Sequence, residues 1–144
     1  CHAYPNKLTP RTATMFKAGG CAYVFFVYGM YHQFNVVVGP ERTANAVLIR
    51  SLEPVAGLDI MKERRRCDNV KNLTTGPGKL CQALGITKQQ HDGIDLRGNE
   101  LWISPRTQDI DFIAKPRVGI DYAGEDKDNP WRYLIKGNPF ISKA

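Results

Sequence analysis

The chain has 144 residues, of which 42% are hydrophobic and 24% are charged. This balance is typical of an ordinary soluble globular protein, and the length suits one domain with its own core. No apolar run is long enough to cross a bilayer, and the polar first residues do not form the apolar centre of a signal peptide. Lys and Arg number 20 against 14 Asp and Glu, and the net charge of +6 favours a polyanionic partner such as nucleic acid.

The spacing of cysteine and histidine argues against a metal centre. The four cysteines form no C-x-x-C pair: they are Cys1, Cys21, Cys67 and Cys81. They are also sparser than in a small secreted disulfide scaffold, so we expect reduced, structural cysteines in a cytosolic or nuclear compartment. The histidines are isolated, without an H-E-x-x-H motif: they are His2, His32 and His91. We therefore expect no metal site.

The first half of the chain predicts a loop, a hairpin and a short strand. Residues 1–16 are polar and contain two prolines, which favours an irregular loop. Residues 22–28 and 31–38 are rich in aromatic and β-branched side chains, and their separation predicts a β-hairpin with its tip near Gly29. Residues 46–51 predict a further strand, which ends before Pro54.

The second half predicts short helices and strands. Residues 58–66 favour a helix with a basic outer face, and a second helix starts near Gly76 or Thr75, has Pro77 in its first turn and ends at Gly85. Further strands are expected at residues 101–104, 117–120 and 131–135. Without regular βαβ alternation, these elements predict the α+β class, as a single domain with a curved antiparallel β-sheet, a protruding β-hairpin and short helices.

The predicted hairpin carries an unusual number of aromatic rings. Phe26 and Phe34 are expected in the core. Tyr28, Met30 and Tyr31 stand at the solvent end of the hairpin, where large apolar groups are a liability unless they bind something. In a basic protein, an exposed aromatic ring at a hairpin tip is what a wedge for the minor groove of DNA would look like, and a plain surface aromatic is the alternative.

Three polar residues stand out by their position. A buried Arg is costly unless it is paired, so Arg50 should meet a carboxylate or a backbone carbonyl, in a structural ion pair or in a site. Asn35 either satisfies a sheet edge or lines a pocket. The segment TGPGKL lacks the spacing of a nucleotide-hydrolysing phosphate loop. Its N–H groups beside Lys79 suit a single DNA phosphate, with plain helix capping as the alternative, and the run Arg64 to Arg66 is typical of a solvated helix face.

Four longer segments carry a resemblance to a known family. They are YVFFVYGMYHQFNVVV, VLIRSLEPVAG, TTGPGKLCQALGI and PRVGIDYAG…PWRYLIKGNPFIS. From His2 to Ser142, in order, the chain resembles the alkyladenine (3-methyladenine) DNA glycosylases of base-excision repair. The resemblance implies a mixed α/β domain on a curved antiparallel sheet, with no cofactor. It implies double-stranded DNA as the partner and alkylated or deaminated purines as substrates, such as 3-methyladenine, hypoxanthine and ethenoadenine.

The resemblance also assigns roles to residues. The hairpin tip enters the minor groove with Tyr28, beside Met30 and Tyr31. The residues that meet the flipped base are His2, Phe25, Asn35 and Leu48. Phe25 stands where better-known members have Tyr, and Asn35 would exclude the guanine amino group. Arg50 would position the attacking water, and Lys79 would contact the DNA backbone.

The implied reaction is hydrolysis of the N-glycosidic bond of a flipped purine, with a Glu as general base. In the family this Glu lies in an E-x-E-A-Y-like strand shortly before the residue that matches His2, and this chain begins at Cys1. We expect residues 1–144 to form one glycosylase domain that is N-terminally incomplete, with a degenerate copy as the alternative. On this expectation the chain alone binds damaged DNA poorly and releases almost no base.

Two other functions compete with the enzyme. One is a non-catalytic module that binds damaged DNA. The other is an RNA-binding domain of related fold, like the C-terminal domain of methionyl-tRNA formyltransferase, against which Tyr28, Asn35 and Arg50 argue. We expect a monomer with no membrane partner, in the cytoplasm or nucleoid of a bacterium or the nucleus of a eukaryote.

Overall fold

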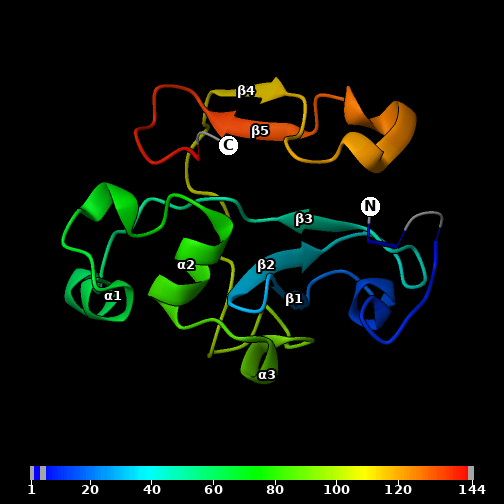
Figure 1. The fold of residues 1–144 in the computed structure, drawn as a ribbon, viewed down its shortest axis with the longest axis horizontal. Helices are drawn as coiled ribbons and strands as arrows, with labels where there is room; N and C mark the ends of the chain where they lie inside the picture. The colour runs from blue at the N-terminus through cyan, green and yellow to red at the C-terminus, as the bar shows by residue number, and fades with distance from the viewer. Residues whose placement is uncertain (1, 4–5, 143–144) are drawn as a thin grey trace.

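The computed structural model describes residues 2–3 and 6–142 (Figure 1). Short helices and strands alternate irregularly along the chain. In chain order the elements are η1 (Ala13–Phe16), β1 (Ala22–Val27), β2 (Tyr31–Val37), β3 (Ala46–Leu48), α1 (Leu58–Arg65), η2 (Val70–Asn72), α2 (Pro77–Leu84), α3 (Lys88–His91), β4 (Phe112–Lys115), η3 (Asp121–Lys127) and β5 (Arg132–Ile135). The predicted α+β class is confirmed.

All strand pairs are antiparallel, and they form two sheets. The larger sheet has the order β1-β2-β3, and the smaller one pairs β4 with β5. The hairpin of β1 and β2 is confirmed, with Val27 opposite Tyr31 at its end. The curved sheet expected from the sequence is therefore divided into two. Hydrogen bonds between the segment after β3 and the segment after β5 connect the two parts.

The two faces of the larger sheet pack against different parts of the chain, because side chains alternate between faces along each strand. Ala22, Val24 and Phe34 face α2 and share a core with Leu80, Cys81, Ile86 and Leu96. Tyr23, Phe25 and Val37 face the opposite way and pack on the segment that precedes β1, with Ala3, Met15 and Cys21. The second face is the one that carries most of the candidate site residues.

Helix α2 begins and ends as its sequence predicts. Gly76 precedes it as the N-cap with φ of 153°, Pro77 occupies its first turn, and Gly85 ends it in the left-handed region. The Thr75 hydroxyl does not cap the helix but donates to the Lys71 carbonyl oxygen at 2.8 Å. Helix α1 packs against α2 through a small cluster of Met61, Leu73 and Ala83.

The basic run after Met61 is not simply a solvated helix face. Arg64 donates through Nη1 to the Ala83 carbonyl oxygen at 3.2 Å, and Arg65 donates to the side-chain oxygen of Gln82. Two of the three arginines therefore fasten α1 to α2. Arg64 also satisfies a carbonyl in the last turn of α2, where a positive charge is favourable.

Several predicted elements are wrong in detail. Residues 101–104 form no strand; Trp102 makes only an isolated bridge with Arg97. Residues 117–120 are a bend, and the strand of this region is β4, which ends before Pro116. The strand predicted at residues 46–51 stops at Leu48. The opening loop contains the short helix η1.

Phe26 is a further correction, because 45% of its surface is exposed whereas Phe34 is buried. Phe26 lies opposite His32 near the end of the hairpin, and the two rings are in contact with centroids 4.8 Å apart. Cys21, Cys67 and Cys81 carry free thiols. Within residues 2–3 and 6–142, no helix is long and apolar enough to cross a membrane.

Candidate functional site

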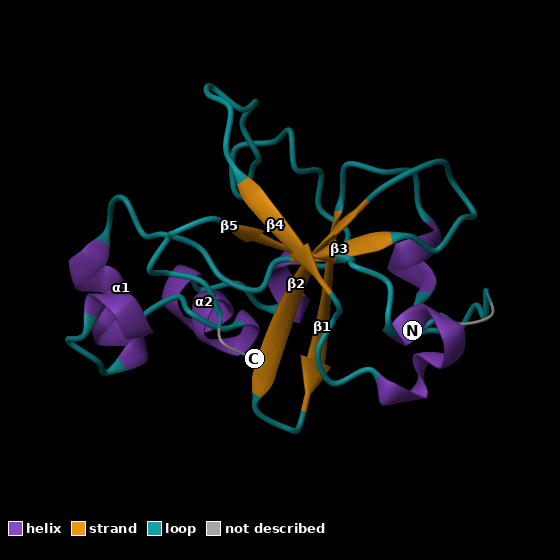
Figure 2. Ribbon diagram, turned by 90° about the horizontal axis from the view of Figure 1, so that it is seen from above, coloured by secondary structure: helices purple, strands orange, loops and turns teal. Residues whose placement is uncertain are grey.

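The tip of the β1–β2 hairpin is the most exposed aromatic site of the fold. The turn projects beyond the neighbouring elements in Figure 2. It closes through a hydrogen bond from the Met30 N–H to the Val27 carbonyl oxygen at 3.2 Å. Tyr28 is 85% exposed and Met30 is 64% exposed, so two large apolar side chains stand in solvent at the end of the hairpin.

The backbone of Tyr28 is strained. Its φ is +53°, and Gly29 beside it has φ of +66°. Two consecutive positive φ angles are the pattern of a tight hairpin turn that normally takes Asn-Gly or Asp-Gly. A bulky residue in this region costs about 1–2 kcal/mol relative to its relaxed conformation. Tyr28 therefore contributes nothing to folding that a smaller polar residue would not supply better, and its presence needs a functional reason.

The strand register brings three predicted pocket residues onto one sheet face. Residues opposite each other in antiparallel strands share a face, and Asn35 lies opposite both Tyr23 and Leu48. Phe25, two residues after Tyr23, points to the same side. His2 joins them from the first segment of the chain, with its ring edge-on to Phe25 at a centroid distance of 4.4 Å. His2, Phe25, Asn35 and Leu48 thus form one wall.

Polar contacts fix the His2 end of this wall. The Tyr23 hydroxyl lies 3.4 Å from Nδ1 of His2. Arg11 lies over the other side of the wall, with its guanidinium carbon 5.6 Å from the centroid of the Phe25 ring. Burial, followed by the charge of Arg11, lowers the pKa of His2, so the imidazole is neutral at neutral pH. Sequence reasoning missed Arg11, because nothing in the local pattern placed it over an aromatic ring.

Asn35 is held firmly. It is only 7% exposed, and its side-chain nitrogen donates to the Tyr23 carbonyl oxygen at 3.2 Å. The amide is therefore tied across the strand pair and cannot turn freely.

Arg50 follows Leu48 by two residues and does not meet the partner expected from the sequence. Its Nε is buried without a hydrogen-bond partner, and no described side chain forms an ion pair with it. The prediction that Arg50 meets a carboxylate or a backbone carbonyl is wrong within the part of the chain that the structure describes. Burial, and then the charge of Arg132, lowers the pKa of Arg50, although an arginine keeps its charge at neutral pH.

Helix α2 approaches the hairpin closely at Gly78. A Cβ on Gly78 would lie 2.9 Å from Cδ1 of Tyr31, so only glycine permits this contact. Lys79 donates through Nζ to the side-chain oxygen of Asn72. The start of α2 therefore lies against the hairpin through Gly78. The sequence predicted here either a phosphate contact by Lys79 or plain helix capping, but not the contact between Gly78 and Tyr31.

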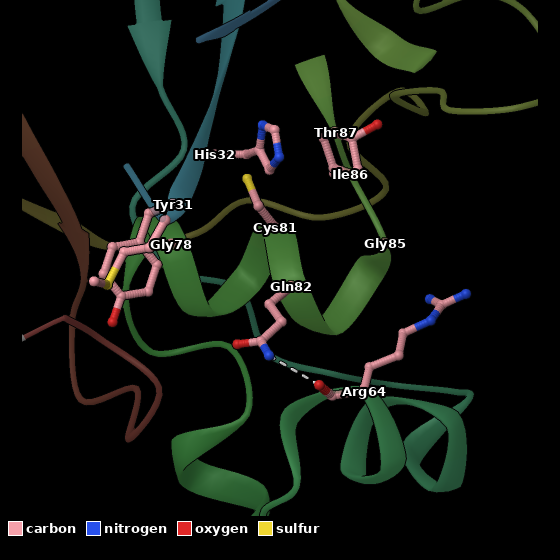
Figure 3. A pocket seen from close by; sticks show the side chains of 10 residues that line it. Tyr31, His32, Arg64, Gly78, Cys81, Gln82, Gly85, Ile86 and Thr87 are labelled. Carbon is pink, nitrogen blue, oxygen red and sulfur yellow. Dashed lines mark hydrogen bonds between the residues drawn. The ribbon is translucent and has the colours of Figure 1, made fainter. Parts of the chain in front are cut away.

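A cavity of about 570 Å³ lies on the other side of the hairpin (Figure 3). Met30, Tyr31 and His32 line it from the hairpin, and Cys81, Gln82 and Thr87 are among the residues that close it. Cys81 points toward His32, and Gln82 points toward Arg64, to whose carbonyl oxygen it donates at 2.9 Å. None of the four wall residues lines this cavity, so it is not the predicted base pocket. No described His, Cys, Asp and Glu side chains gather in a group that could hold a metal ion.

Comparison with known proteins decides the family. The profile of the methylpurine-DNA glycosylases matches residues 1–139. The chain belongs to the methylpurine-DNA glycosylase family. It is 45% identical over 151 residues to a protein of Alkaliphilus oremlandii, covering 99% of this chain and 74% of that protein. It is 47% identical over 154 residues to a protein of Bacillus cereus strain G9842, covering 99% and 75%.

Both relatives carry the name "putative 3-methyladenine DNA glycosylase". A protein of Bacillus cytotoxicus with the same name is 45% identical over 154 residues, covering 99% of this chain and 75% of that protein. The resemblance stated from the sequence is therefore confirmed, and with it the class of DNA-repair glycosylase hydrolases. The roles assigned to single residues of this chain are predictions.

Proposed function

We propose that this protein flips alkylated or deaminated purines out of duplex DNA and hydrolyses their N-glycosidic bond, as a monomer acting in base-excision repair. The single observation that carries the proposal is Tyr28, an 85% exposed tyrosine held at positive φ on a projecting hairpin. Folding alone disfavours a tyrosine there. A wedge that fills the space left by a flipped nucleotide needs a large, rigid, partly apolar group at that place.

We propose that the flipped purine stacks on the wall behind the hairpin. Phe25 is only 5% exposed, with Arg11 over its ring and His2 at its edge, so the segment before β1 has to move aside when the base enters. Neutral His2 then avoids repelling a base that carries a positive charge from alkylation. Asn35 and Leu48 continue the same face. We propose that Asn35, fixed by the Tyr23 carbonyl oxygen, excludes the 2-amino group of guanine from this place.

The DNA backbone would be held by positive charge outside the wall. The chain carries a net charge of +6, and Lys79 stands in the first turn of α2, next in sequence to Gly78, which lies against Tyr31. Binding would then depend strongly on salt, because phosphate contacts release counterions. The wedge favours double-stranded DNA over an RNA loop, whereas the charge suits either nucleic acid.

Hydrolysis needs a water and a general base. Arg50, two residues beyond Leu48, is the described residue that we propose to position the water next to the flipped sugar. A carboxylate would serve as the base, since Glu and Asp are common in this role. No described carboxylate contacts Arg50, and this observation favours a second candidate function, a module that binds damaged DNA without cutting it.

One experiment separates the two candidates. The chain is mixed in excess with a duplex that contains a single inosine, and both binding and released hypoxanthine are followed over a single turnover. Binding with release above the uncatalysed rate supports the glycosylase. Binding that favours the inosine duplex over the normal one, without release by this chain or by a version extended upstream of Cys1, supports the module. Absence of any preference for the inosine duplex contradicts both functions.

A further inference from the structure

Arg50 and Arg132 approach each other where the two sheets meet. Arg132 of β5 donates through Nη2 to the Ser142 carbonyl oxygen at 2.7 Å, and the Ser142 N–H donates to Oγ of Ser51 at 3.1 Å. Asn138 donates to a carboxylate oxygen of Glu53 at 2.8 Å, which fastens the same two segments together. The chain after β3 and the end of the chain after β5 are thus joined, and each contributes one arginine.

Neither guanidinium is fully satisfied by the protein. The Nε atoms of Arg50 and Arg132 are both buried without a hydrogen-bond partner. No described carboxylate forms an ion pair with either side chain. Two positive charges on neighbouring segments repel each other when no anion lies between them, and partial burial makes each of them more costly. An oxyanion between them would remove both penalties.

Comparison with the other arginines shows that the state of Arg50 is unusual, whereas Arg132 keeps one hydrogen bond to a carbonyl oxygen. Arg65 and Arg117 also have a buried Nε without a partner. Arg65, however, donates to Gln82, and Arg117 donates to the Asp126 carbonyl oxygen at 3.1 Å and stacks on the Trp131 ring at 5.0 Å. Arg50 makes no hydrogen bond to any described residue, so its donors are those most in need of an external acceptor.

We propose that Arg50 and Arg132 together bind one backbone phosphate of the DNA, next to the flipped nucleotide. The proposal rests on the proposed function and adds to it a second residue, Arg132, and a ligand. The five N–H donors of the Arg50 guanidinium allow it to bind a phosphate oxygen and the attacking water at once. A base on the wall of Phe25, Asn35 and Leu48 is tied through its sugar to a phosphate on either side. An anion therefore has to come close to the strand end that carries Arg50. The planar fork of an arginine matches two phosphate oxygens at once.

The test removes the charge of Arg132 and the charge of one DNA phosphate, first separately and then together. The ligand is a duplex with a tetrahydrofuran abasic site, which cannot be cut by a glycosylase. One linkage next to this site, 5′ or 3′ in turn, is made a neutral methylphosphonate. Binding is measured for the unchanged chain, for Arg132→Gln and for the control Arg97→Gln, which removes a charge from an exposed Arg paired with Asp95. Thermal unfolding checks that each variant is folded.

At one of the two linkages, we expect Arg132→Gln and the methylphosphonate each to weaken binding about tenfold, as befits a charged hydrogen bond. Combined, they should weaken it no more than either alone, because they remove the same contact. Arg97→Gln should leave the effect of the methylphosphonate unchanged. If the losses multiply at both linkages, the phosphate site is wrong, and the arginines serve an anion of the protein instead.

A second variant covers the case in which Arg132→Gln does not fold. Arg132→Lys keeps the charge and loses the fork, so it should weaken binding to the natural linkage but not to the methylphosphonate. If Arg132→Lys weakens binding equally to the natural and the methylphosphonate duplex, the proposal is contradicted. Failure of the unchanged chain to prefer abasic over intact duplex contradicts the proposed function itself, whereas normal preference with multiplying losses contradicts the phosphate site alone.

Discussion

Tyr28 and Gly29 form the centre of the hairpin turn with φ angles of +53° and +66°, and only the second of them is suited to that conformation. The turn would be more stable with Asn in place of Tyr28, because Asn tolerates positive φ and exposes no aromatic ring. Stability and function therefore make opposite demands on this residue. A change at Tyr28 should alter the two in opposite directions.

Tyr28→Asn should raise the free energy of unfolding by about 1 kcal/mol, since it relieves backbone strain, and raise Tm by roughly 3 °C. The same change should weaken binding to a lesion-containing duplex, because the wedge is lost. Denaturant unfolding and DNA titration measure the two effects. Tyr122→Ala, which removes another exposed tyrosine, is the control and should leave DNA binding unchanged. A Tyr28→Asn protein that is less stable, or binds equally well, would refute this view of the turn.

Asn35→Ser should relax the choice of base. The shorter side chain removes the rigid group that we propose to exclude the guanine amino group. Binding to duplexes with hypoxanthine or guanine at one position should therefore differ less in the variant than in the unchanged chain. The variant should also lose about 1 kcal/mol of stability, because a buried hydrogen bond is removed. Unaltered discrimination would assign Asn35 to the fold only.

Salt should weaken DNA binding steeply. The logarithm of the binding constant should fall linearly with the logarithm of the salt concentration, and Lys79→Met should reduce the slope by about 1. Lys127→Met removes an exposed lysine far along the chain from α2 and serves as the control. A slope near zero in the unchanged protein would contradict DNA binding through phosphate contacts.

Acid should destabilise the fold through His32. Its Nδ1 accepts the Lys88 N–H at 3.1 Å, and burial lowers its pKa below the ordinary value. A histidine whose pKa is lower in the folded state binds fewer protons there than in the unfolded chain. The stability is therefore complete above a pH of about 6.5 and is lost as the pH falls. His32→Gln should lose less stability than the unchanged chain between about pH 7.5 and about pH 5 in denaturant unfolding. Parallel pH curves would contradict this assignment.

The hairpin and helix α2 were predictable from the sequence because their signals are local. Aromatic and β-branched residues on both sides of Gly29 determine the hairpin, and Pro77 and Gly85 mark the ends of the helix. The β4 strand was not predictable, since its side chains are all exposed and no alternating pattern identifies them. The exposure of Phe26 follows from the burial of the adjacent Phe25, because neighbours in a strand face opposite sides of the sheet. The side that carries Phe26 is left uncovered near the turn.

The residues of the candidate site also fall into a group that was predictable from the sequence and a group that was not. The family resemblance identified the residues of the wall, and the strand register explains why Phe25, Asn35 and Leu48 share a face. Arg11 and Arg132 were missed, because each reaches the site from a segment distant in sequence. The unpaired state of Arg50 also depends on tertiary contacts, which no local pattern records.

Flipping of the damaged nucleotide by Tyr28 is the central claim, and fluorescence of 2-aminopurine placed beside an inosine in a duplex tests it most directly. Unstacking of the neighbouring base raises this fluorescence when the inosine leaves the helix. The account predicts a clear increase with the unchanged chain and little or none with Tyr28→Ala, when both are added at concentrations that saturate the duplex and so offset the weak binding expected of the chain alone. An equal increase with both proteins, or no increase with either while the duplex is bound, would contradict it.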